Sequence, residues 1–247
     1  MTLPQRSSNN SRLVSGLLGA IAMLAFATMA VSATDSGKPA RIGIIGTGKI
    51  GGTLAELWVK SGHEVMISSR HPDQLKELAG KLGPKAKVGT PAEAASFGDV
   101  VLISVPYGAT PQVGRDYAKQ LAGKVVLDTG NPYPERDGPM AEQARTKGAG
   151  LSSKEFLPGV RLVRAFNAIS AASLRSEAHR AGDPIAIPIA GDDAAAVKEA
   201  SALVRDAGFE PVVVGDLSQA RRFDVGTPVY VHLMSGKELR AALGLTN

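Results

Sequence analysis

The feature that most constrains the fold is a glycine-rich turn between an apolar run and a helical pattern. Residues 41–45 (RIGII) are apolar and rich in isoleucine, and Gly46, Gly48 and Gly51 follow at the spacing GxGxxG, opening a helix-period stretch at 50–61. In this context the first glycine permits a tight turn, the second lets the backbone approach a pyrophosphate, and the third lets the helix pack close to the strand. Free N–H groups at the start of the helix would bind that pyrophosphate. The segment therefore predicts a dinucleotide-binding loop.

The rest of the chain alternates short apolar runs with helical patterns. The runs predicted as strands are 41–45, 64–68, 100–105, 124–128, 161–165, 185–190 and 211–214. The stretches predicted as helices are 50–61, 72–82, 91–96, 110–121, 140–148, 192–207 and 235–243. Nearly continuous apolar strands that alternate with helices are typical of a parallel sheet covered on both faces. We therefore expect an α/β fold of the Rossmann type, with a doubly wound, mainly parallel sheet and helices on both faces.

The first part of the chain has the pattern of an export signal. Residues 1–12 contain two arginines and no acidic residue, and residues 13–33 carry no charge and end in small residues. This pattern is typical of a signal peptide, and the apolar run is also long enough for an uncleaved membrane anchor. We expect an exported protein, either periplasmic, extracellular or anchored in the membrane through residues 13–33. A true start at Met23 or Met29 would instead make the protein cytoplasmic.

The remaining sequence divides into three parts. Residues 34–40 are expected to form a linker, 41–215 the dinucleotide-binding Rossmann domain, and 216–247 a small helical extension. About 30 residues after the last predicted strand are too few for a separate helical domain.

Composition excludes several classes of site. The chain contains no cysteine, which excludes a disulfide scaffold, a thiolate zinc site, an iron–sulfur cluster and a thiol nucleophile. Its four histidines show no metal-ligand spacing, so no metal is expected. The net charge is +5 and aromatic residues make up only 4% of the chain, which does not indicate a nucleic-acid partner.

The end of the second predicted strand favours NADP(H) over NAD(H). An NAD site usually places a carboxylate there to bind the ribose 2′-hydroxyl, but the strand 64–68 ends in Ser68, Ser69, Arg70 and His71. The planar guanidinium of Arg70 suits a 2′-phosphate, and the two hydroxyls and the imidazole can add hydrogen bonds. In the alternative interpretation, the serines only cap the following helix and Arg70 is a solvated surface residue.

Three later strands end in residues that suit the nicotinamide side of the crevice. The candidates are Ser104 at the end of the run 100–105 and Pro106 after it, Asn131 after 124–128, and Asn167 after 161–165. Asp128 and Phe166 are expected to be structural. No YxxxK pair and no His–Asp pair is evident in the sequence, so no catalytic residue is assigned. Reduction of a ketone needs a proton donor, whereas transfer between two cofactor rings chiefly needs their juxtaposition.

An ordered set of motifs carries a family resemblance. The segments are Gly46-Thr47-Gly48-Lys49-Ile50-Gly51, Ser69-Arg70, Val105-Pro106, Asn131-Pro132-Tyr133-Pro134 and Ala165-Phe166-Asn167. This set resembles the NADPH-dependent reductases of the deazaflavin coenzyme F420, and it is also similar to the NADPH-binding domain of the STEAP metalloreductases. The resemblance covers about residues 41–220.

The resemblance implies hydride transfer between NADP(H) and F420, or to a flavin such as FMN or FAD in the STEAP branch. It implies that Thr47, Lys49 and Ile50 join the phosphate loop and that Ser69 and Arg70 hold the 2′-phosphate. Val105, Pro106 and the segment from Ala165 to Asn167 would line the ring pocket. The resemblance also implies a homodimer. One departure is Gln74, which stands where some members have a lysine, with Lys76 nearby.

Two other functions stay open at this point. One is reduction of an imine or a 2-hydroxy acid with the same cofactor, although such enzymes need a larger helical C-terminal region. The other is an exported dinucleotide-binding sensor or subunit without its own catalysis, which the export signal favours. Residues 221–230 could complete the pocket for a second small-molecule substrate, with Arg221 and Arg222 attracting an acidic cofactor tail or forming only a solvated pair.

Overall fold

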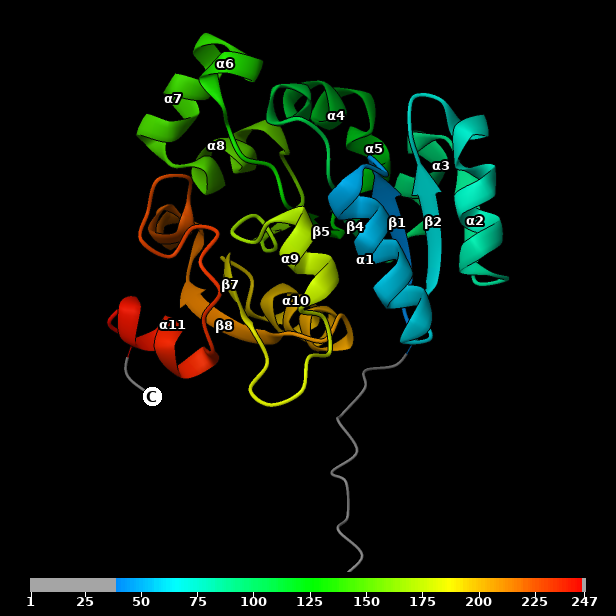
Figure 1. Cartoon of the computed structure of the whole chain (residues 1–247). Coiled ribbons are helices and arrows are strands. Elements are labelled where there is room, and N and C mark those ends of the chain that lie inside the picture. Colours follow the sequence, from blue (N-terminus) through cyan, green and yellow to red (C-terminus); the bar gives the residue numbers. More distant parts are fainter. Residues whose placement is uncertain (1–38, 246–247) are drawn as a thin grey trace, which may run out of the picture. The chain divides into compact units, whose positions relative to one another are not determined.

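The computed structural model describes residues 39–245, drawn in colour in Figure 1. The predicted export segment 1–33 and most of the predicted linker lie outside this range. Within residues 39–245, every helix is too short or too polar to cross a bilayer.

The described residues contain a sheet with strand order β3-β2-β1-β4-β5-β6-β7-β8. All neighbouring strands pair in parallel except β6 and β7, which pair antiparallel. The strands are β1 (Arg41–Ile45), β2 (Glu64–Ser68), β3 (Ala86–Gly89), β4 (Val100–Ile103), β5 (Val125–Asp128), β6 (Arg161–Arg164), β7 (Ala186–Gly191) and β8 (Glu210–Gly215). The expected Rossmann-type, mainly parallel sheet is confirmed.

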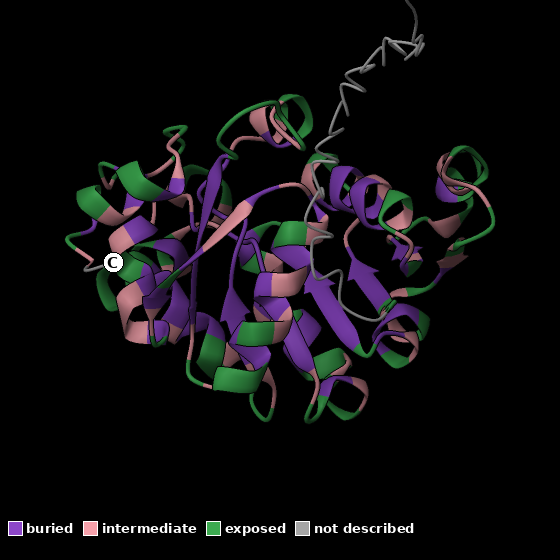
Figure 2. Ribbon diagram, turned by 90° about the horizontal axis from the view of Figure 1, so that it is seen from below, coloured by how far each residue is buried: buried purple, intermediate pink, exposed green. Residues whose placement is uncertain are grey.

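Helices cover both faces of this sheet. They are α1 (Lys49–Lys60), α2 (Lys76–Leu82), α3 (Pro91–Phe97), α4 (Thr110–Asp116), α5 (Ala118–Leu121), α6 (Pro134–Asp137), α7 (Pro139–Lys147), α8 (Ala149–Phe156), α9 (Ala171–Ser176), α10 (Ala194–Asp206) and α11 (Gly236–Ala242). Short 3-10 turns are η1 (Pro72–Leu75), η2 (Tyr107–Ala109) and η3 (Leu217–Phe223). Figure 2 shows buried strands in the interior and exposed residues on the outer sides of the helices.

The core lies on both sides of the sheet because side chains alternate along each strand. In β4, Val100 and Leu102 pack with Trp58 of α1, whereas Val101 and Ile103 pack with Leu121 of α5. Every residue of β4 and β5 is buried. Burial on both faces explains why these strands are almost continuously apolar.

The predicted elements differ from the structure in a few places. Strand β3 was not among the predicted runs, because its sequence AKVG is short and only half apolar. It lies at the edge of the sheet and pairs only with β2 among the described strands. Helices α8 and α9 were also missed, and the predicted helix 110–121 divides at Tyr117, whose φ of −118° interrupts it.

The segment that follows β8 packs on the last two strands. One hydrophobic core contains Val212 and Val214 of β8 together with three residues of this segment. These three are Phe223 at the end of η3, Val229 in the connection that follows, and Leu239 of α11. Ile185 and Ser235 form a bridge beside β7. The predicted C-terminal extension is therefore part of the layer over β7 and β8.

Candidate functional site

The carboxyl ends of β1 and β2 build the glycine loop. The N–H groups of Gly46 and Thr47 both donate to Ser68 O, at 3.2 and 3.1 Å, and Thr47 Oγ1 donates to the same oxygen at 3.0 Å. The Ser68 hydroxyl donates to Ile44 O at 2.6 Å and is fully buried. Ser68, predicted as a cofactor contact, thus holds the loop in place with both its hydroxyl and its carbonyl group.

The three motif glycines occupy different environments. Gly46 has a φ of +98°, and a Cβ on Gly51 would lie 2.2 Å from Gly46 O. The fold itself therefore requires glycine at these two positions. A Cβ on Gly48 would meet nothing within 4 Å, and the φ of Gly48 is −85°, which any residue can adopt. The space beside Gly48 is therefore open to a group from outside the chain.

The start of α1 suits an anion. Gly48 is its N-cap and makes no side-chain cap hydrogen bond, and the first turn contains no acidic residue. Gly48 and Lys49 are exposed, and Ile50 is half-buried. Backbone N–H groups at a helix start carry partial positive charge and lack partners within the helix. These residues fit a dinucleotide pyrophosphate, as the motif predicts.

The segment after β2 carries the residues predicted for the 2′-phosphate. Arg70 and His71 are exposed, and Arg70 pairs with no carboxylate in residues 39–245. Ser69 Oγ accepts the His71 N–H at 3.0 Å, but neither η1 nor α2, which follow, begins with a side-chain cap hydrogen bond. The nearby Asp73 pairs with Lys76 at 2.7 Å. Lys76 is thus engaged by a neighbour, and Arg70 is the cation left available for a phosphate.

The tip of β4 lies against the glycine loop. Ser104 N donates to Ile45 O at 2.9 Å, and Val105 Cγ1 would be 2.8 Å from a Cβ on Gly46. Val105 is half-buried and Pro106 is exposed, so both can contact a ligand at this edge. Ala165, which the resemblance placed in the ring pocket, is fully buried in the core.

The two predicted asparagines lie together although 36 residues separate them. Asn131 Nδ2 donates to Asn167 O at 2.7 Å, and Asn167 Nδ2 lies 3.4 Å from Asn131 Oδ1 and 3.3 Å from Phe223 O. Asn167 is buried and Asn131 is half-buried. Of the pair, Asn131 is the one whose side chain is accessible to a ligand.

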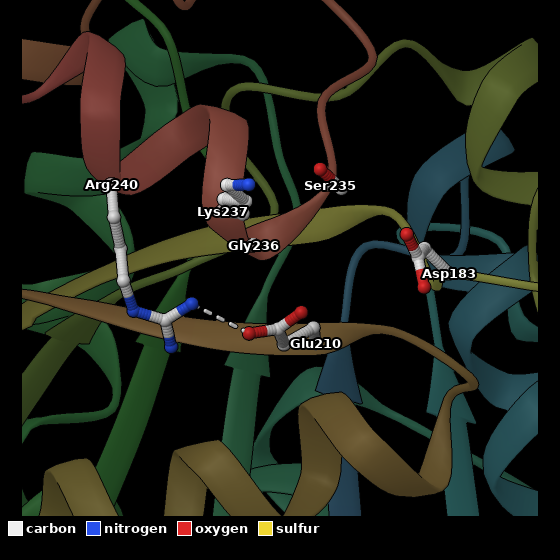
Figure 3. Close-up of a pocket in the computed structure, with 6 residues that line it drawn as sticks. All are labelled: Asp183, Glu210, Ser235, Gly236, Lys237 and Arg240. Carbon is white, nitrogen blue, oxygen red and sulfur yellow. Dashed lines mark hydrogen bonds and ion pairs between the residues drawn. The ribbon is translucent and has the colours of Figure 1, made fainter. Parts of the chain in front are cut away.

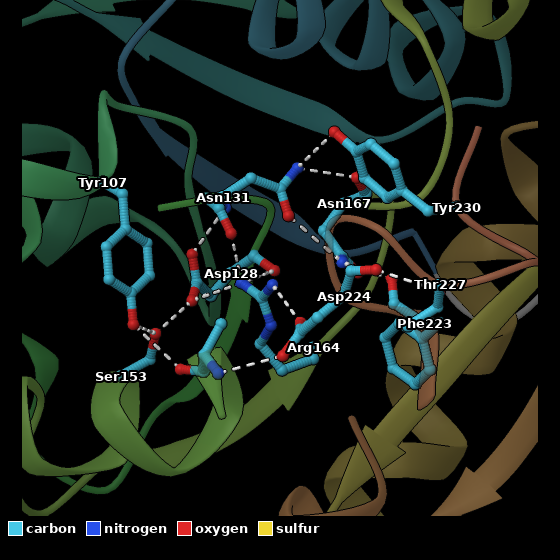
Figure 4. A network of polar contacts seen from close by, with 12 residues as sticks. Tyr107, Asp128, Asn131, Ser153, Arg164, Asn167, Phe223, Asp224, Thr227 and Tyr230 are labelled. Atoms are coloured by element: carbon cyan, nitrogen blue, oxygen red, sulfur yellow. Dashed lines mark hydrogen bonds and ion pairs between the residues drawn. The ribbon is translucent and has the colours of Figure 1, made fainter. Parts of the chain in front are cut away.

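A buried ion pair lies next to the loop that connects β5 to Asn131 (Figure 4). Asp128 Oδ2 accepts from Arg164 Nη1 at 2.8 Å and from Ser153 Oγ at 2.6 Å, and its Oδ1 accepts from Gly130 N at 2.8 Å. Burial disfavours the Arg164 charge, but the carboxylates of Asp128 and Asp224 outweigh it and keep the pKa of Arg164 above its usual range. Asp128 is thus structural, as expected, while its partner Arg164 was not predicted.

Two tyrosines lie at the same place: Tyr133 belongs to the motif 131–134 and Tyr230 to residues 221–230, but the sequence assigned neither of them a role of its own. The hydroxyl groups of Tyr133 and Tyr230 form a hydrogen bond, and Asn131 Nδ2 lies 3.4 Å from Tyr230 OH. Burial raises the pKa of Tyr230 above its usual range, so the phenol keeps its proton at neutral pH. The sequence places these tyrosines 97 residues apart, so only the fold brings them together.

A hollow of about 370 Å³ lies between α11 and β8, away from the strand tips described above (Figure 3). It is lined by Asp183, Glu210, Ser235, Gly236, Lys237 and Arg240. Glu210 and Arg240 pair at 2.7 Å, and a Cβ on Gly236 would lie 2.0 Å from Glu210 Oε1. The hollow is thus partly closed by the Glu210–Arg240 pair, and its lining comes from elements other than those strand tips. No group of acidic or histidine residues in 39–245 is arranged to hold a metal ion.

Comparison with known proteins agrees with these features. A sequence model of the family "NADP oxidoreductase coenzyme F420-dependent" matches residues 41–132. The F420-dependent NADP reductase of Methanothermobacter thermautotrophicus is 28% identical over 224 residues, which cover 84% of this chain and 95% of that protein. A crystal structure from Arthrobacter sp. FB24, assigned as an F420-dependent NADP reductase, has 26% identity and a TM-score of 0.65, with 84% and 96% of the two chains covered.

A second relative is larger. Metalloreductase STEAP3 of Rattus norvegicus is 32% identical over 187 residues, which cover 74% of this chain and 36% of STEAP3. This chain therefore spans about a third of the length of that relative. The matches agree with the resemblance drawn from the motifs: the chain is similar to the F420-dependent NADP reductases over nearly their whole length and to about a third of STEAP3.

Proposed function

We propose that this protein transfers a hydride between NADP(H) and a flavin or deazaflavin such as F420. The main support for the proposal is the open space beside Gly48, where α1 begins without a side-chain cap. The Asn131–Asn167 pair lies on the same edge of the sheet. One end of this edge suits a pyrophosphate, and the other suits a flat polar ring. The similarity to F420-dependent NADP reductases over nearly their whole length supports the choice of acceptor.

The chain's own residues would divide the binding of NADP(H) as follows. The N–H groups at the start of α1 would bind the pyrophosphate, and Arg70 with Ser69 and His71 would bind the 2′-phosphate. Asn131 would accept a hydrogen bond from the ribose or the carboxamide at Oδ1, since its Nδ2 donates to Asn167 O and Tyr230 OH. Val105 and Pro106 would contact the nicotinamide ring. The bound cofactor supplies the hydride, and the protein orients the two rings and excludes water between them.

One cation in the C-terminal segment is available for the acidic tail of an acceptor. Arg221 is exposed, whereas Arg222 donates to Leu243 O and so ties η3 to the end of α11. Of the two arginines considered from the sequence, Arg221 is therefore the one that we propose contacts the acceptor.

Turnover tests this proposal. The purified protein is mixed with NADPH and either F420 or FMN, and the loss of nicotinamide absorbance is followed, with Gly48→Val as the inactive control. Catalytic oxidation of NADPH that depends on the acceptor supports the proposal. Tight NADPH binding without turnover would favour a dinucleotide-binding sensor or subunit, and absence of NADPH binding would refute the assignment of the site.

Export is a separate proposal that rests on the charge-free run 13–33. We propose that a signal peptidase cleaves after Ala33 or that the run remains as an anchor. Cell fractionation with mass spectrometry of the mature N-terminus tests this. A protein found in the cytoplasm with a start at Met23 or Met29 would contradict it.

A further inference from the structure

A cluster of neutral hydrogen-bonding groups lies beyond the tips of β5 and β6. Tyr133 and Asn131 come from the segment after β5, Asn167 follows β6, and Tyr230 lies between η3 and α11. The hydroxyl of Tyr230 contacts both the hydroxyl of Tyr133 and Nδ2 of Asn131, the latter at 3.4 Å. Figure 4 shows Tyr230 directed at the Asn131–Asn167 pair. The C-terminal segment thus contributes a phenol to the part of the edge where the acceptor ring would lie.

Two residues beside this cluster have a strained backbone conformation. Phe166 and Val231 have φ values of +60° and +55°, which are unfavourable for residues with bulky side chains. Phe166 directly precedes Asn167, and Val231 directly follows Tyr230. Val231 N donates to Ala168 O at 2.9 Å and so joins the two strained segments directly. Strain of this kind persists where the surroundings fix it, and it concentrates at functional sites.

The hydroxyl of Tyr230 can present its proton to a ligand. Asn131 Nδ2 can only donate, so the Tyr230 oxygen is its acceptor. Either hydroxyl can donate in the contact between Tyr133 and Tyr230. We take the arrangement in which Tyr133 donates to the Tyr230 oxygen, which leaves the Tyr230 O–H for the ligand. Arg136 keeps Tyr133 and Asn131 in place, because its guanidinium lies 5.1 Å from the Tyr133 ring centroid and its Nη2 donates to Asn131 O at 2.8 Å. Both tyrosines are half-buried, which leaves part of each side chain accessible.

We propose that Tyr230 donates a hydrogen bond to the acceptor ring at the heteroatom where negative charge develops, and that Tyr133 and Asn131 are positioning residues for it. The proposal rests on the proposed function. A hydride with its two electrons leaves the nicotinamide, which is oxidised, and reduces the acceptor ring. The acceptor then takes one proton from water, with Tyr230 stabilising the charge until that proton arrives. This gives the second substrate a specific donor in a site for which the sequence suggested none.

The test compares Tyr230→Phe and Tyr133→Phe with Tyr117→Phe, a control at the junction of α4 and α5. Each variant is checked by thermal unfolding, and NADPH affinity is measured by nicotinamide fluorescence. We expect NADPH affinity to stay within about twofold in all three, because the phosphates are bound elsewhere. In Tyr230→Phe, kcat with F420 should fall about tenfold or more, as for loss of a hydrogen bond to a charged group. Tyr133→Phe should lose less, and Tyr117→Phe should match the parent.

A second readout needs no turnover. Quenching of F420 fluorescence in the presence of NADP+ measures acceptor binding, and its affinity should fall in Tyr230→Phe but not in Tyr117→Phe. Parent-like turnover and binding in Tyr230→Phe would overturn the inference while leaving the proposed function intact. If the parent protein itself neither binds nor reduces F420 or FMN, the proposed function fails, and this inference fails with it.

Discussion

Arg164 and Asp128 are direct neighbours across β6 and β5, and they form an ion pair of 2.8 Å in which neither side chain is exposed. Arg164 Nη1 also donates to Gly130 O at 2.6 Å, and its Nη2 lies 3.4 Å from Asp224 Oδ1. One guanidinium therefore connects two strand tips, the loop that leads to Asn131, and the segment after η3. The position of the asparagines and of Tyr230 depends on this buried charge.

Removing Arg164 should destabilise the protein strongly. Arg164→Met leaves the Asp128 carboxylate buried without its counter-ion, and breaking a buried pair in this way costs about 3–5 kcal/mol. Chemical denaturation of the variant measures the change in the free energy of unfolding. Arg161→Met is the matched control on the same strand, because Arg161 pairs with Asp193 at the surface and should lose about 1 kcal/mol or less. Equal losses in the two variants would contradict the role given to Arg164.

Gly48 and Gly51 should respond differently to substitution. Gly48→Val places a side chain in open space, so the fold should lose only about 1 kcal/mol through a poorer N-cap. Binding of both NADPH and NADH should be abolished, because the side chain occupies the space of the pyrophosphate. Gly51→Ala should instead lower stability by about 1–3 kcal/mol or more, because its Cβ meets Gly46 O at 2.2 Å. Thermal unfolding and nicotinamide fluorescence separate the two effects, and NADPH binding by Gly48→Val would refute the loop assignment.

Arg70 should determine the preference for NADPH. In Arg70→Ala the affinity for NADPH should fall about tenfold or more, as for the loss of a charge-assisted contact, while the affinity for NADH barely changes. Arg115→Ala removes another exposed arginine, on α4, and should change neither affinity. Fluorescence titration with both cofactors gives the comparison. Equal losses for NADPH and NADH in Arg70→Ala would show that Arg70 does not bind the 2′-phosphate.

Most of the fold was predictable because burial and local pattern agree. The runs that became β4 and β5 are buried on both faces, so their apolar residues are continuous in the sequence. Helix α8 was missed because it packs through small residues: a Cβ on Gly150 would lie 2.8 Å from Leu217 O. Where a helix packs through glycine and other small residues, its sequence does not show the regular spacing of large apolar residues that predicts a helix.

The site was predictable where its residues form a local motif or stand at the tip of a strand. The glycine loop and the Ser69–Arg70 segment are local motifs, and Asn131 and Asn167 stand at strand tips, so topology alone gives their approximate place. Arg164 and Tyr230 interact with residues that are distant in the sequence. Arg164 pairs with Asp128, 36 positions away, and Tyr230 bonds to Tyr133, 97 positions away. An arginine in a four-residue strand with the sequence RLVR gave no sign that it would be fully buried.

The strain at Val231 should affect stability and activity in opposite directions. The left-handed φ of Val231 destabilises the folded protein by about 1–2 kcal/mol, and glycine at this position would remove that cost. Glycine also makes the unfolded chain more flexible, which lowers the gain in stability by about 0.5–1 kcal/mol. Val231→Gly should therefore raise the free energy of unfolding by up to about 1 kcal/mol, yet lower kcat with F420 because Tyr230 is held less firmly. His179→Gly is the matched control, since His179 is exposed with a φ of +54° and should gain stability without loss of activity. Unchanged kcat in Val231→Gly would argue against a functional role of the strain.

The central claim is hydride transfer from the nicotinamide ring of NADPH to the acceptor. The most direct measurement uses NADPH carrying deuterium at C4, on one face or the other, with F420 as acceptor, and mass spectrometry of the reduced product. We predict that deuterium from one face appears in reduced F420 and that deuterium from the other face stays in NADP+. Reduced F420 without deuterium from either face would contradict the account, and so would a protein that reduces neither F420 nor FMN.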